Sequence, residues 1–215
     1  MQRLRIKFSR GEEVKFISHL DVMRLWQRAI HRAGIPLAYS EGYNPRPRIS
    51  LAAPLAVGVT SEAELMDVFC TRWVSPHFFT AALNQQLPPG IAMRQILPVS
   101  LILPSLQAQL RLAEYSVTVE TNARQKEIEA KLTSLLALET LPWQHQRDTG
   151  VRQYDLRTLI SDLWLINCQP PYGTIGMRLR CDSGGSGRPE QVIIALGFTA
   201  HPRSMHRTEL ILETN

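Results

Sequence analysis

Residues 4–34, LRIKFSRGEEVKFISHLDVMRLWQRAIHRAG, decide the fold because a strand pattern is followed directly by a helix pattern. Leu4–Phe8 alternates apolar and charged residues, which is typical of a half-buried β-strand. Ser18 with Asp21 three residues later is a variant of the capping box that begins helices. Gly34 suits the position just after a helix. We therefore predict a strand near Leu4–Phe8 and a helix that begins at Ser18 and ends just before Gly34.

The rest of the chain continues this alternation of strands and helices. An extended stretch at 49–58, a strand at 63–73, a helix from Ser75-Pro76 and a strand at 91–99 complete the order β-α-β-β-α-β. This is the order of the ferredoxin-like, or split βαβ, arrangement. The second half repeats it, with strands at 114–120, 154–168, 174–181 and 206–213 and helices at 122–138 and 190–196. We predict the α+β fold class, as two tandem ferredoxin-like (split βαβ) sandwiches spanning residues 1–103 and 104–215.

The 215-residue chain has a formal net charge of +5, and its positive charge is almost entirely arginine. Of its 24 lysine and arginine residues only four are lysine, which leaves 20 arginines. Arginine is favoured at phosphates and base edges because its planar guanidinium offers several donors in a fixed geometry. The excess favours a nucleic-acid partner, although a genome rich in G and C produces the same bias.

The cysteine and histidine spacings indicate neither a metal site nor a bound cofactor. Cys70, Cys168 and Cys181 are far apart and form no CxxC pair, and the six histidines form no HxH or HExxH motif. The chain opens with charged residues among the apolar ones, and no apolar run approaches the length of a membrane span. We expect a cytoplasmic protein with no membrane contact.

The segment Ser40–Ser50, SEGYNPRPRIS, is the strongest candidate for a binding site in the first half. Gly42 permits a positive φ, Asn44 before a proline favours a turn, and two prolines hold the following chain extended. Arg46 and Arg48 are two residues apart and point the same way on such a chain. With Tyr43 and Asn44 they suit a planar or phosphate-bearing partner. The alternative is a surface loop whose arginines are only solvated.

Further arginines form candidate contacts on other elements. Arg24, Arg28 and Arg32 are four residues apart and share one face of the first helix, a pattern that also occurs on plain solvated surfaces. In the second half, the glycine-rich stretch Gly184–Arg188 precedes a helix. Backbone N–H groups there are expected to bind an anion together with Arg188, or else to form a simple turn and cap.

The remaining candidates come from single residues. Arg157 follows Asp155 on a predicted strand and is expected either to pair with it or to face a ligand, and Arg207 lies on the last strand. We expect residues 42–48 and 184–188 to lie on one positive surface, with Arg157, Arg188 and Arg207 facing Arg46 and Arg48. The alternative is that the arginines pair with the 19 acidic residues.

Several blocks of the sequence resemble the radical-SAM-linked proteins, the bacterial family defined by domain of unknown function 2344. These blocks are residues 5–26, 38–64, 154–160, 185–190 and 206–210. Thr158 stands where that family carries proline. Members are encoded beside, or fused to, a radical-SAM protein, near genes for a ribonuclease and ribosomal proteins. The resemblance therefore implies a radical-SAM partner and a role in RNA metabolism, without assigning a reaction.

Three functions follow from these observations. The leading hypothesis is an RNA-binding accessory module, not expected to be a self-contained enzyme, that presents a tRNA or rRNA to a radical-SAM enzyme for modification or processing. Its RNA contacts are predicted at Arg24, Arg28, Tyr43, Asn44, Arg46, Arg48, Arg157, Arg188 and Arg207. One alternative is a metal-independent endoribonuclease in which His19, the one candidate catalytic residue, acts with Tyr43 and Arg46. The other is a protein adaptor that docks through the apolar run Leu51–Gly58 without touching RNA.

Overall fold

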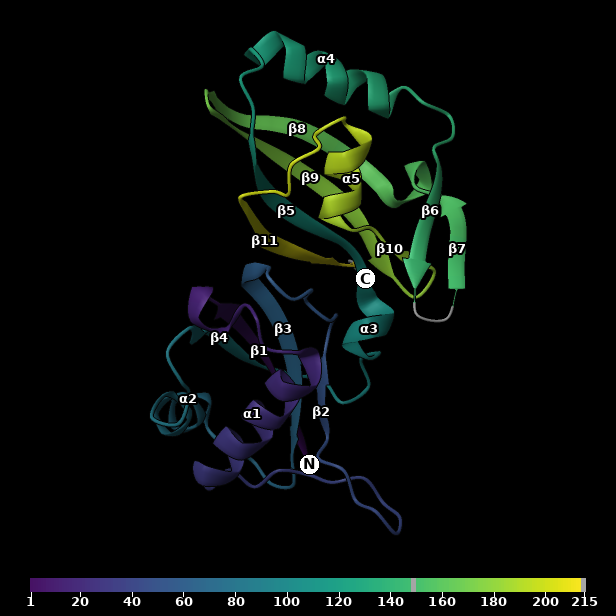
Figure 1. Cartoon of the computed structure of the whole chain (residues 1–215). Coiled ribbons are helices and arrows are strands. Elements are labelled where there is room, and N and C mark those ends of the chain that lie inside the picture. Colours follow the sequence, from purple (N-terminus) through teal and green to yellow (C-terminus); the bar gives the residue numbers. More distant parts are fainter. Residues whose placement is uncertain (148–149, 214–215) are drawn as a thin grey trace. The chain divides into compact units, whose positions relative to one another are not determined.

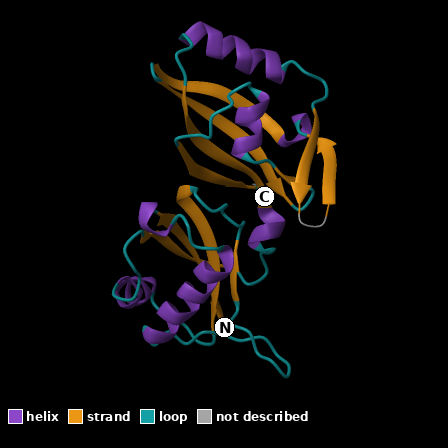
Figure 2. Cartoon of the chain, in the orientation of Figure 1, coloured by secondary structure: helices purple, strands orange, loops and turns teal. Residues whose placement is uncertain are grey.

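The computed structural model describes residues 1–147 and 150–213, which form two compact units (Figure 1). Unit 1 comprises Met1–Leu110 and the segment that begins at Leu212, and unit 2 comprises Arg111–Ile211. Both units combine a sheet with helices (Figure 2). The predicted α+β class is therefore confirmed.

Unit 1 contains one antiparallel sheet with the strand order β4-β1-β3-β2. Its elements follow the order β-α-β-β-α-β and end in a short helix: β1 Gln2–Arg10, α1 His19–Arg32, β2 Ile49–Leu51, β3 Thr60–Cys70, α2 Pro76–Asn84, β4 Ile91–Val99 and α3 Leu106–Gln109. A single 3₁₀ turn, Glu12–Val14, separates β1 from α1. The two central strands of unit 1 are thus β3 and β1, the strand with which the sequence pattern begins.

Alternation along β1 directs its side chains to two different environments. Leu4, Ile6 and Phe8 are fully buried and join the core beneath α1 and α2. On α1, Trp26 is also fully buried, and its ring meets the Phe8 ring edge-on with the ring centroids 4.8 Å apart. Burial of these large apolar side chains is the main stabilising term of unit 1.

On the opposite face of β1, two arginines bind one buried carboxylate of β3. Arg3 and Asp67 are almost completely buried, and Arg3 Nη2 lies 2.5 Å from Asp67 Oδ2. Arg5, which is directly opposite Asp67 in the strand register, donates from Nε to Asp67 Oδ1 over 2.9 Å. The Arg3 guanidinium also donates to the carbonyl oxygens of Leu103 (2.6 Å) and Pro104 (2.8 Å). This Arg3–Asp67–Arg5 cluster therefore joins the sheet to the segment that follows β4.

In unit 2, β9 lies between β5 and β8, and β5 lies between β9 and β11. The elements of unit 2 are β5 Leu110–Glu120, α4 Gln125–Leu136, β6 Pro142–Arg147, β7 Gly150–Asp155, the 3₁₀ turn Arg157–Leu159, β8 Ile160–Gln169, β9 Tyr172–Asp182, β10 Gly185–Ser186, α5 Pro189–Ala195 and β11 Ser204–Leu212. The hairpin β6–β7, the 3₁₀ turn and β10 are additions to the order β-α-β-β-α-β. The hairpin β6–β7 forms its own sheet.

The predicted single strand at 154–168 is wrong, because the chain turns at Asp155. Its Oδ1 accepts the backbone N–H groups of Leu141 (2.8 Å) and Arg157 (2.9 Å), and the Thr158 hydroxyl donates to the Asp155 carbonyl oxygen. These bonds end β7 and start the 3₁₀ turn, so β8 begins only at Ile160. The strand β6 was not predicted.

We predict that Asp67→Asn strongly destabilises unit 1. The neutral amide leaves the buried Arg3 guanidinium without its counter-charge, and breaking a buried pair in this way costs about 3–5 kcal/mol. Urea unfolding followed by circular dichroism measures the change. Glu12→Gln, which removes the exposed ion pair with Lys15, is the control and should leave the urea midpoint unchanged. An equal, small effect of both substitutions would show that the cluster is not required.

Candidate nucleic-acid interface

Residues 40–48 form a loop whose two ends are joined by hydrogen bonds. Ser40 N donates to the Arg46 carbonyl oxygen (2.8 Å), Arg46 N donates to Ser40 Oγ (2.9 Å), and Arg48 N donates to the Ala38 carbonyl oxygen (2.8 Å). Gly42 at the tip has a φ of +118°, which a side-chain-bearing residue rarely adopts. In Figure 1 this loop extends away from the sheet of unit 1. The predicted turn is thus a closed loop on the surface.

The side chains of this loop differ in how they are held. Residues 41–46 are all exposed, and Tyr43 has a relative exposure of 106%, so its ring is fully open to solvent. Arg48 is half-buried, with its guanidinium 4.3 Å from the centre of the Phe69 ring and Nη1 3.2 Å from Met1 Sδ. Arg46 makes no side-chain ion pair within residues 1–147 and 150–213. Tyr43 and Arg46 are therefore available to a ligand, and Arg48 is only partly available.

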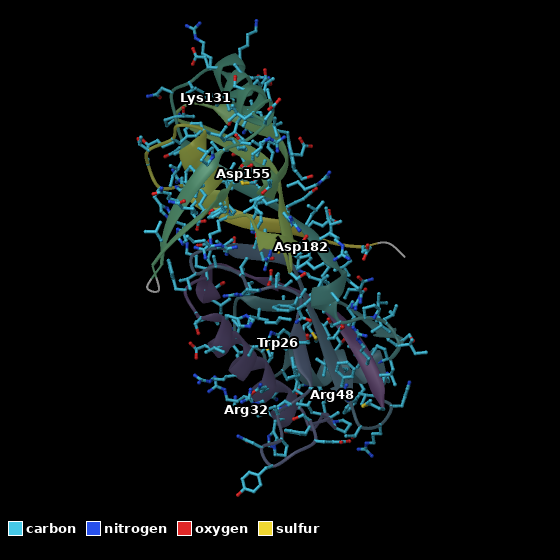
Figure 3. All side chains as sticks on the ribbon, turned by 90° about the vertical axis from the view of Figure 1, so that its right-hand side faces the viewer. Trp26, Arg32, Arg48, Lys131, Asp155 and Asp182 are labelled. Carbon is cyan, nitrogen blue, oxygen red and sulfur yellow. The ribbon has the colours of Figure 1, made fainter. Side chains whose placement is uncertain are left out.

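The arginine face of α1 borders a surface pocket. Arg24, Arg28 and Arg32 are exposed, whereas Trp26 on the other face is buried (Figure 3). Arg28 and Arg32 line a pocket of about 400 Å³ together with the amide side chains of Gln85 and Gln86, which follow α2. No ion pair to Arg28 or Arg32 occurs among the described residues. Four side chains with hydrogen-bond donors thus gather where the sequence indicated only an arginine face.

Arg24 differs from its two neighbours because it has a partner on the same helix. Its Nη1 lies 3.3 Å from Asp21 Oδ1, and both side chains are exposed. The Ser18 hydroxyl donates to Asp21 Oδ2 over 2.7 Å and thereby holds the pKa of Asp21 below its usual value. Slight burial opposes this effect, and the positive charges of Arg24 and Arg28 reinforce it. Arg24 is consequently less available for a phosphate than Arg28.

His19, the candidate catalytic residue, is the first residue of α1 and is half-buried. Its ring Nδ1 is buried, and nothing in the described part of the chain makes a hydrogen bond to it. A general base is normally oriented by such a partner. The geometry thus adds no support to a catalytic role for His19.

Two of the predicted contacts in unit 2 are structural arginines. Arg157 donates from Nε and Nη2 to the Leu136 carbonyl oxygen at the end of α4 (3.2 and 2.9 Å) and from Nη1 to that of Ile160 (2.7 Å). Arg207 is only 1% exposed and lies 6.0 Å from the centre of the Tyr115 ring. The predictions that Arg157 and Arg207 face a ligand are therefore wrong, since a predicted strand position does not reveal which side is covered.

The predicted anion site at Gly184–Arg188 is also wrong, because a carboxylate of the chain already occupies its donors. Asp182 Oδ1 accepts the N–H groups of Gly184 (2.7 Å) and Gly185 (3.1 Å). A hydrogen bond from Arg180 lowers the pKa of Asp182 and keeps it charged. Gly185 and Ser186 form the strand β10 rather than a helix cap. Arg188 itself is exposed, with Nη1 3.2 Å from His145 Nε2.

The available candidates in unit 1 are thus Arg28, Arg32, Tyr43, Asn44 and Arg46. From the sequence, Arg32 is predicted only to share one face of the first helix with Arg24 and Arg28, and no role is predicted for Gln85 or Gln86. The i, i+4 spacing of the three arginines was the signal for Arg32, whereas no local pattern connects α1 to the residues after α2. Residues 42–48 and 184–188 belong to different units, and the single surface expected to contain both stays a prediction.

No helix in the described ranges is both long and apolar enough to cross a membrane. Within the same ranges, no three His, Cys, Asp or Glu side chains gather in a way that could hold a metal ion.

We predict that Ser18→Ala raises the pKa of Asp21 and weakens α1. The substitution removes the hydroxyl that stabilises the ionised carboxyl and the cap that accepts Asp21 N, a loss of about 1 kcal/mol. Because the folded-state pKa is lowered, the stability contributed by Asp21 is present above its unfolded pKa and is lost as the pH falls through the folded value. An NMR titration of the Asp21 carboxyl measures the shift, and Ser75→Ala at the start of α2 is the control. An unchanged titration would contradict this origin of the shift.

Comparison with solved structures shows similarity of fold. The chain is similar to a protein in a structure described as a Cbf5-Nop10-Gar1 complex, with a TM-score of 0.53 and 10% sequence identity over 97% of this chain. A second similar structure is that of the archaeal box H/ACA sRNP Nop10-Cbf5 complex, with a TM-score of 0.48 and 10% identity over 96% of this chain. This chain spans about half the length of both proteins, 48% and 46% respectively.

Comparison with proteins of known sequence gives a family but no individual relative. No curated protein matches the chain. A family model described as "Uncharacterized protein conserved in bacteria (DUF2344)" matches residues 3–189, which is most of the sequence. The chain therefore belongs to the DUF2344 family of bacterial proteins.

Proposed function

We propose that this protein is an RNA-binding accessory module whose contacts lie in unit 1, on the loop at 40–48 and in the pocket beside α1. The observation that carries the proposal is the loop itself. It holds an aromatic ring fully in solvent at Tyr43, next to an arginine, Arg46, that makes no side-chain ion pair within the described ranges. An exposed ring beside an arginine offers a stacking surface and a positive charge to the same ligand.

The chemistry of the loop suits unpaired RNA. Proteins recognise single-stranded RNA by stacking its splayed bases on aromatic rings and guanidinium planes and by binding its phosphates with arginine. Tyr43 offers such a ring, Asn44 offers an amide, and Arg46 offers a charge within three residues. The closure of the loop at Ser40 and Arg46 reduces the entropy that binding would otherwise cost.

The pocket beside α1 suits a phosphate. Arg28 and Arg32 bring two positive charges one helical turn apart, and Gln85 and Gln86 add neutral donors on the facing segment. No carboxylate forms an ion pair with Arg28 or Arg32 in the described part of the chain, so both guanidinium groups can donate to a phosphate. The fold similarity to proteins of RNA–protein complexes is compatible with this function, and it does not carry it.

We predict that two kinds of substitution weaken RNA binding in different ways. Arg28→Ala with Arg32→Ala should lower the slope of log affinity against log salt by roughly 0.7 for each lost phosphate contact. Tyr43→Ala should weaken binding by about 1–3 kcal/mol with little change in slope, because stacking releases no counterions. Filter binding of total cellular RNA across a range of salt concentrations measures both effects.

Arg94→Ala is the matched control for this experiment. Arg94 is exposed on β4 and belongs neither to the loop at 40–48 nor to the lining of the pocket beside α1. Its substitution should leave both affinity and slope unchanged. If the unsubstituted protein binds RNA no more tightly than a neutral protein of similar size, and shows no salt slope, the proposed function is wrong.

We further propose a radical-SAM protein as the partner that acts on the bound RNA. Support comes from the family resemblance and from two exposed apolar side chains of unit 1, Phe16 and Val57, each more than half exposed. A hydrogen bond from Gly58 N to the Lys15 carbonyl oxygen (2.8 Å) brings their segments together. The rest of the run predicted as an adaptor surface is largely core, since Leu51 and Leu55 are buried. Co-purification with the radical-SAM protein, compared with Phe16→Ser, tests this contact.

We also propose that both units are variants of the ferredoxin-like arrangement. Unit 1 has its six elements in the expected order, with β1 and β3 central in the sheet. In unit 2, β5, α4, β8, β9, α5 and β11 follow the same order once the hairpin β6–β7 and β10 are set aside, with β5 and β9 central. A crystal structure with any other central pair in unit 2 would contradict this interpretation.

A further inference from the structure

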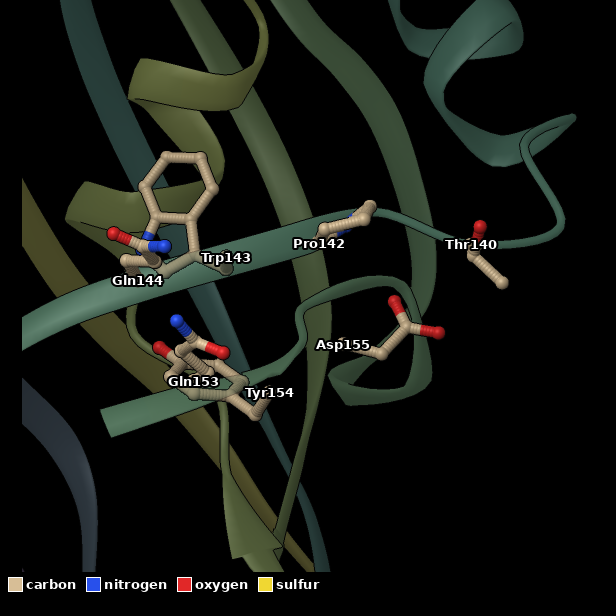
Figure 4. Close-up of a pocket in the computed structure, with 7 residues that line it drawn as sticks. All are labelled: Thr140, Pro142, Trp143, Gln144, Gln153, Tyr154 and Asp155. Carbon is tan, nitrogen blue, oxygen red and sulfur yellow. The ribbon is translucent and has the colours of Figure 1, made fainter. Parts of the chain in front are cut away.

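The hairpin β6–β7 of unit 2 borders the larger of the two pockets described here, about 660 Å³. This volume is within the range of small-molecule sites in proteins. Trp143 and Tyr154 face each other across the two strands, and Gln144 and Gln153 are the next pair along. All four line the pocket, and Figure 4 shows their rings and amide groups together at one end of it, with Thr140 and Asp155 at the other.

We infer that this pocket binds a nucleobase of an unpaired RNA nucleotide. The indole ring of Trp143 is only half-buried, so it has an aromatic surface on which a planar base can stack. Gln144 and Gln153, the adjacent positions on the two strands, are exposed and point to the other face of the hairpin. His145 and Arg152, each two positions from Trp143 or Tyr154, share the face of the indole ring and supply the polar groups there.

The second ring of the pocket is held in place from two sides. The Tyr154 hydroxyl donates to Gln191 Oε1 on α5 over 2.6 Å, and the Arg152 guanidinium lies 5.6 Å from the centre of the Tyr154 ring. Gln191 is 6% exposed, and its Nε2 has no hydrogen-bond partner within the described ranges. The Tyr154 ring is therefore fixed by a buried residue of α5 behind it and by Arg152 in front of its ring.

The charges beside the pocket favour a nucleotide over a neutral ring compound. Arg152 is exposed, His145 is its cross-strand partner, and Arg188 lies 3.2 Å from His145. These groups can bind the phosphate attached to the base. The one acidic group that lines the pocket, Asp155, already accepts two backbone N–H groups through Oδ1 and so serves the fold of the turn.

This inference rests on the proposed function in its choice of RNA as the source of the base, but its site is separate from the arginines and the tyrosine of unit 1. The test therefore uses a signal from Trp143 itself. The full-length protein is labelled with 5-fluorotryptophan, and its four tryptophan signals are followed by fluorine NMR. Trp143→Phe assigns the signal, and Trp73, which is 74% exposed in unit 1, is the internal control.

Adenosine 5′-monophosphate and a short unstructured RNA are each titrated into this protein. We expect both to shift the Trp143 signal and to leave the Trp73 signal in place, whereas ribose 5-phosphate, which has no base, shifts neither. Arg152→Ala should weaken the response to the nucleotide on the order of tenfold, because it removes a positive charge that can bind the phosphate.

The outcomes separate the two proposals. If RNA binds with a salt slope but the Trp143 signal does not move, or if ribose 5-phosphate shifts it as strongly as the nucleotide, the pocket does not bind a base and the proposed function stands. If the nucleotide shifts the Trp143 signal while substitutions in unit 1 leave RNA affinity unchanged, the pocket binds a base and the interface proposed in unit 1 is wrong.

Discussion

The buried Arg3–Asp67–Arg5 cluster is the interaction on which unit 1 depends. Asp67 is directly opposite Arg5, so the cluster forms only in the observed register of β1 and β3. A slip of one residue would move every side chain to the other face of the sheet and bury an arginine without its acid. The same register places Leu4, Ile6 and Phe8 beneath the helices. One alternation along β1 thus specifies both the apolar core and the charged cluster, and the cluster also fixes the segment that leaves β4.

The structure divides the arginine excess into two groups. Arg3, Arg157 and Arg207 are covered or fully committed to partners within the fold, and Arg178 and Arg180 form ion pairs with neighbouring carboxylates. By contrast, a few exposed arginines, above all Arg28, Arg32 and Arg46, lie beside an aromatic ring or beside amide groups. These few positions and their neighbours therefore favour RNA binding, whereas the net charge of +5 is by itself weak evidence for an RNA partner.

The sequence predicted well the parts of the fold that local patterns determine. Ser18 and Ser75 begin α1 and α2 as expected, Gly34 follows α1 with a φ of +66°, and β4 spans Ile91–Val99 as predicted. Local patterns failed where a carboxylate accepts backbone N–H groups of the turn that follows it or of another segment. The carboxylate of Asp155 divides one predicted strand in two, and that of Asp182 fills the predicted anion site. In the candidate site, the loop at 40–48 followed from its glycine and prolines, whereas the pocket beside α1 needed the contact between α1 and the residues after α2.

Photochemical cross-linking of the full-length protein to bound RNA tests the account most directly, because it locates the contact without assuming which residue matters. After ultraviolet irradiation and nuclease digestion, mass spectrometry identifies the peptides that carry a nucleotide. The account predicts a cross-link within residues 40–48, centred on Tyr43, and a second on the hairpin at Trp143 or Tyr154. Cross-links confined to other parts of the chain, in a sample that demonstrably binds RNA, would contradict it.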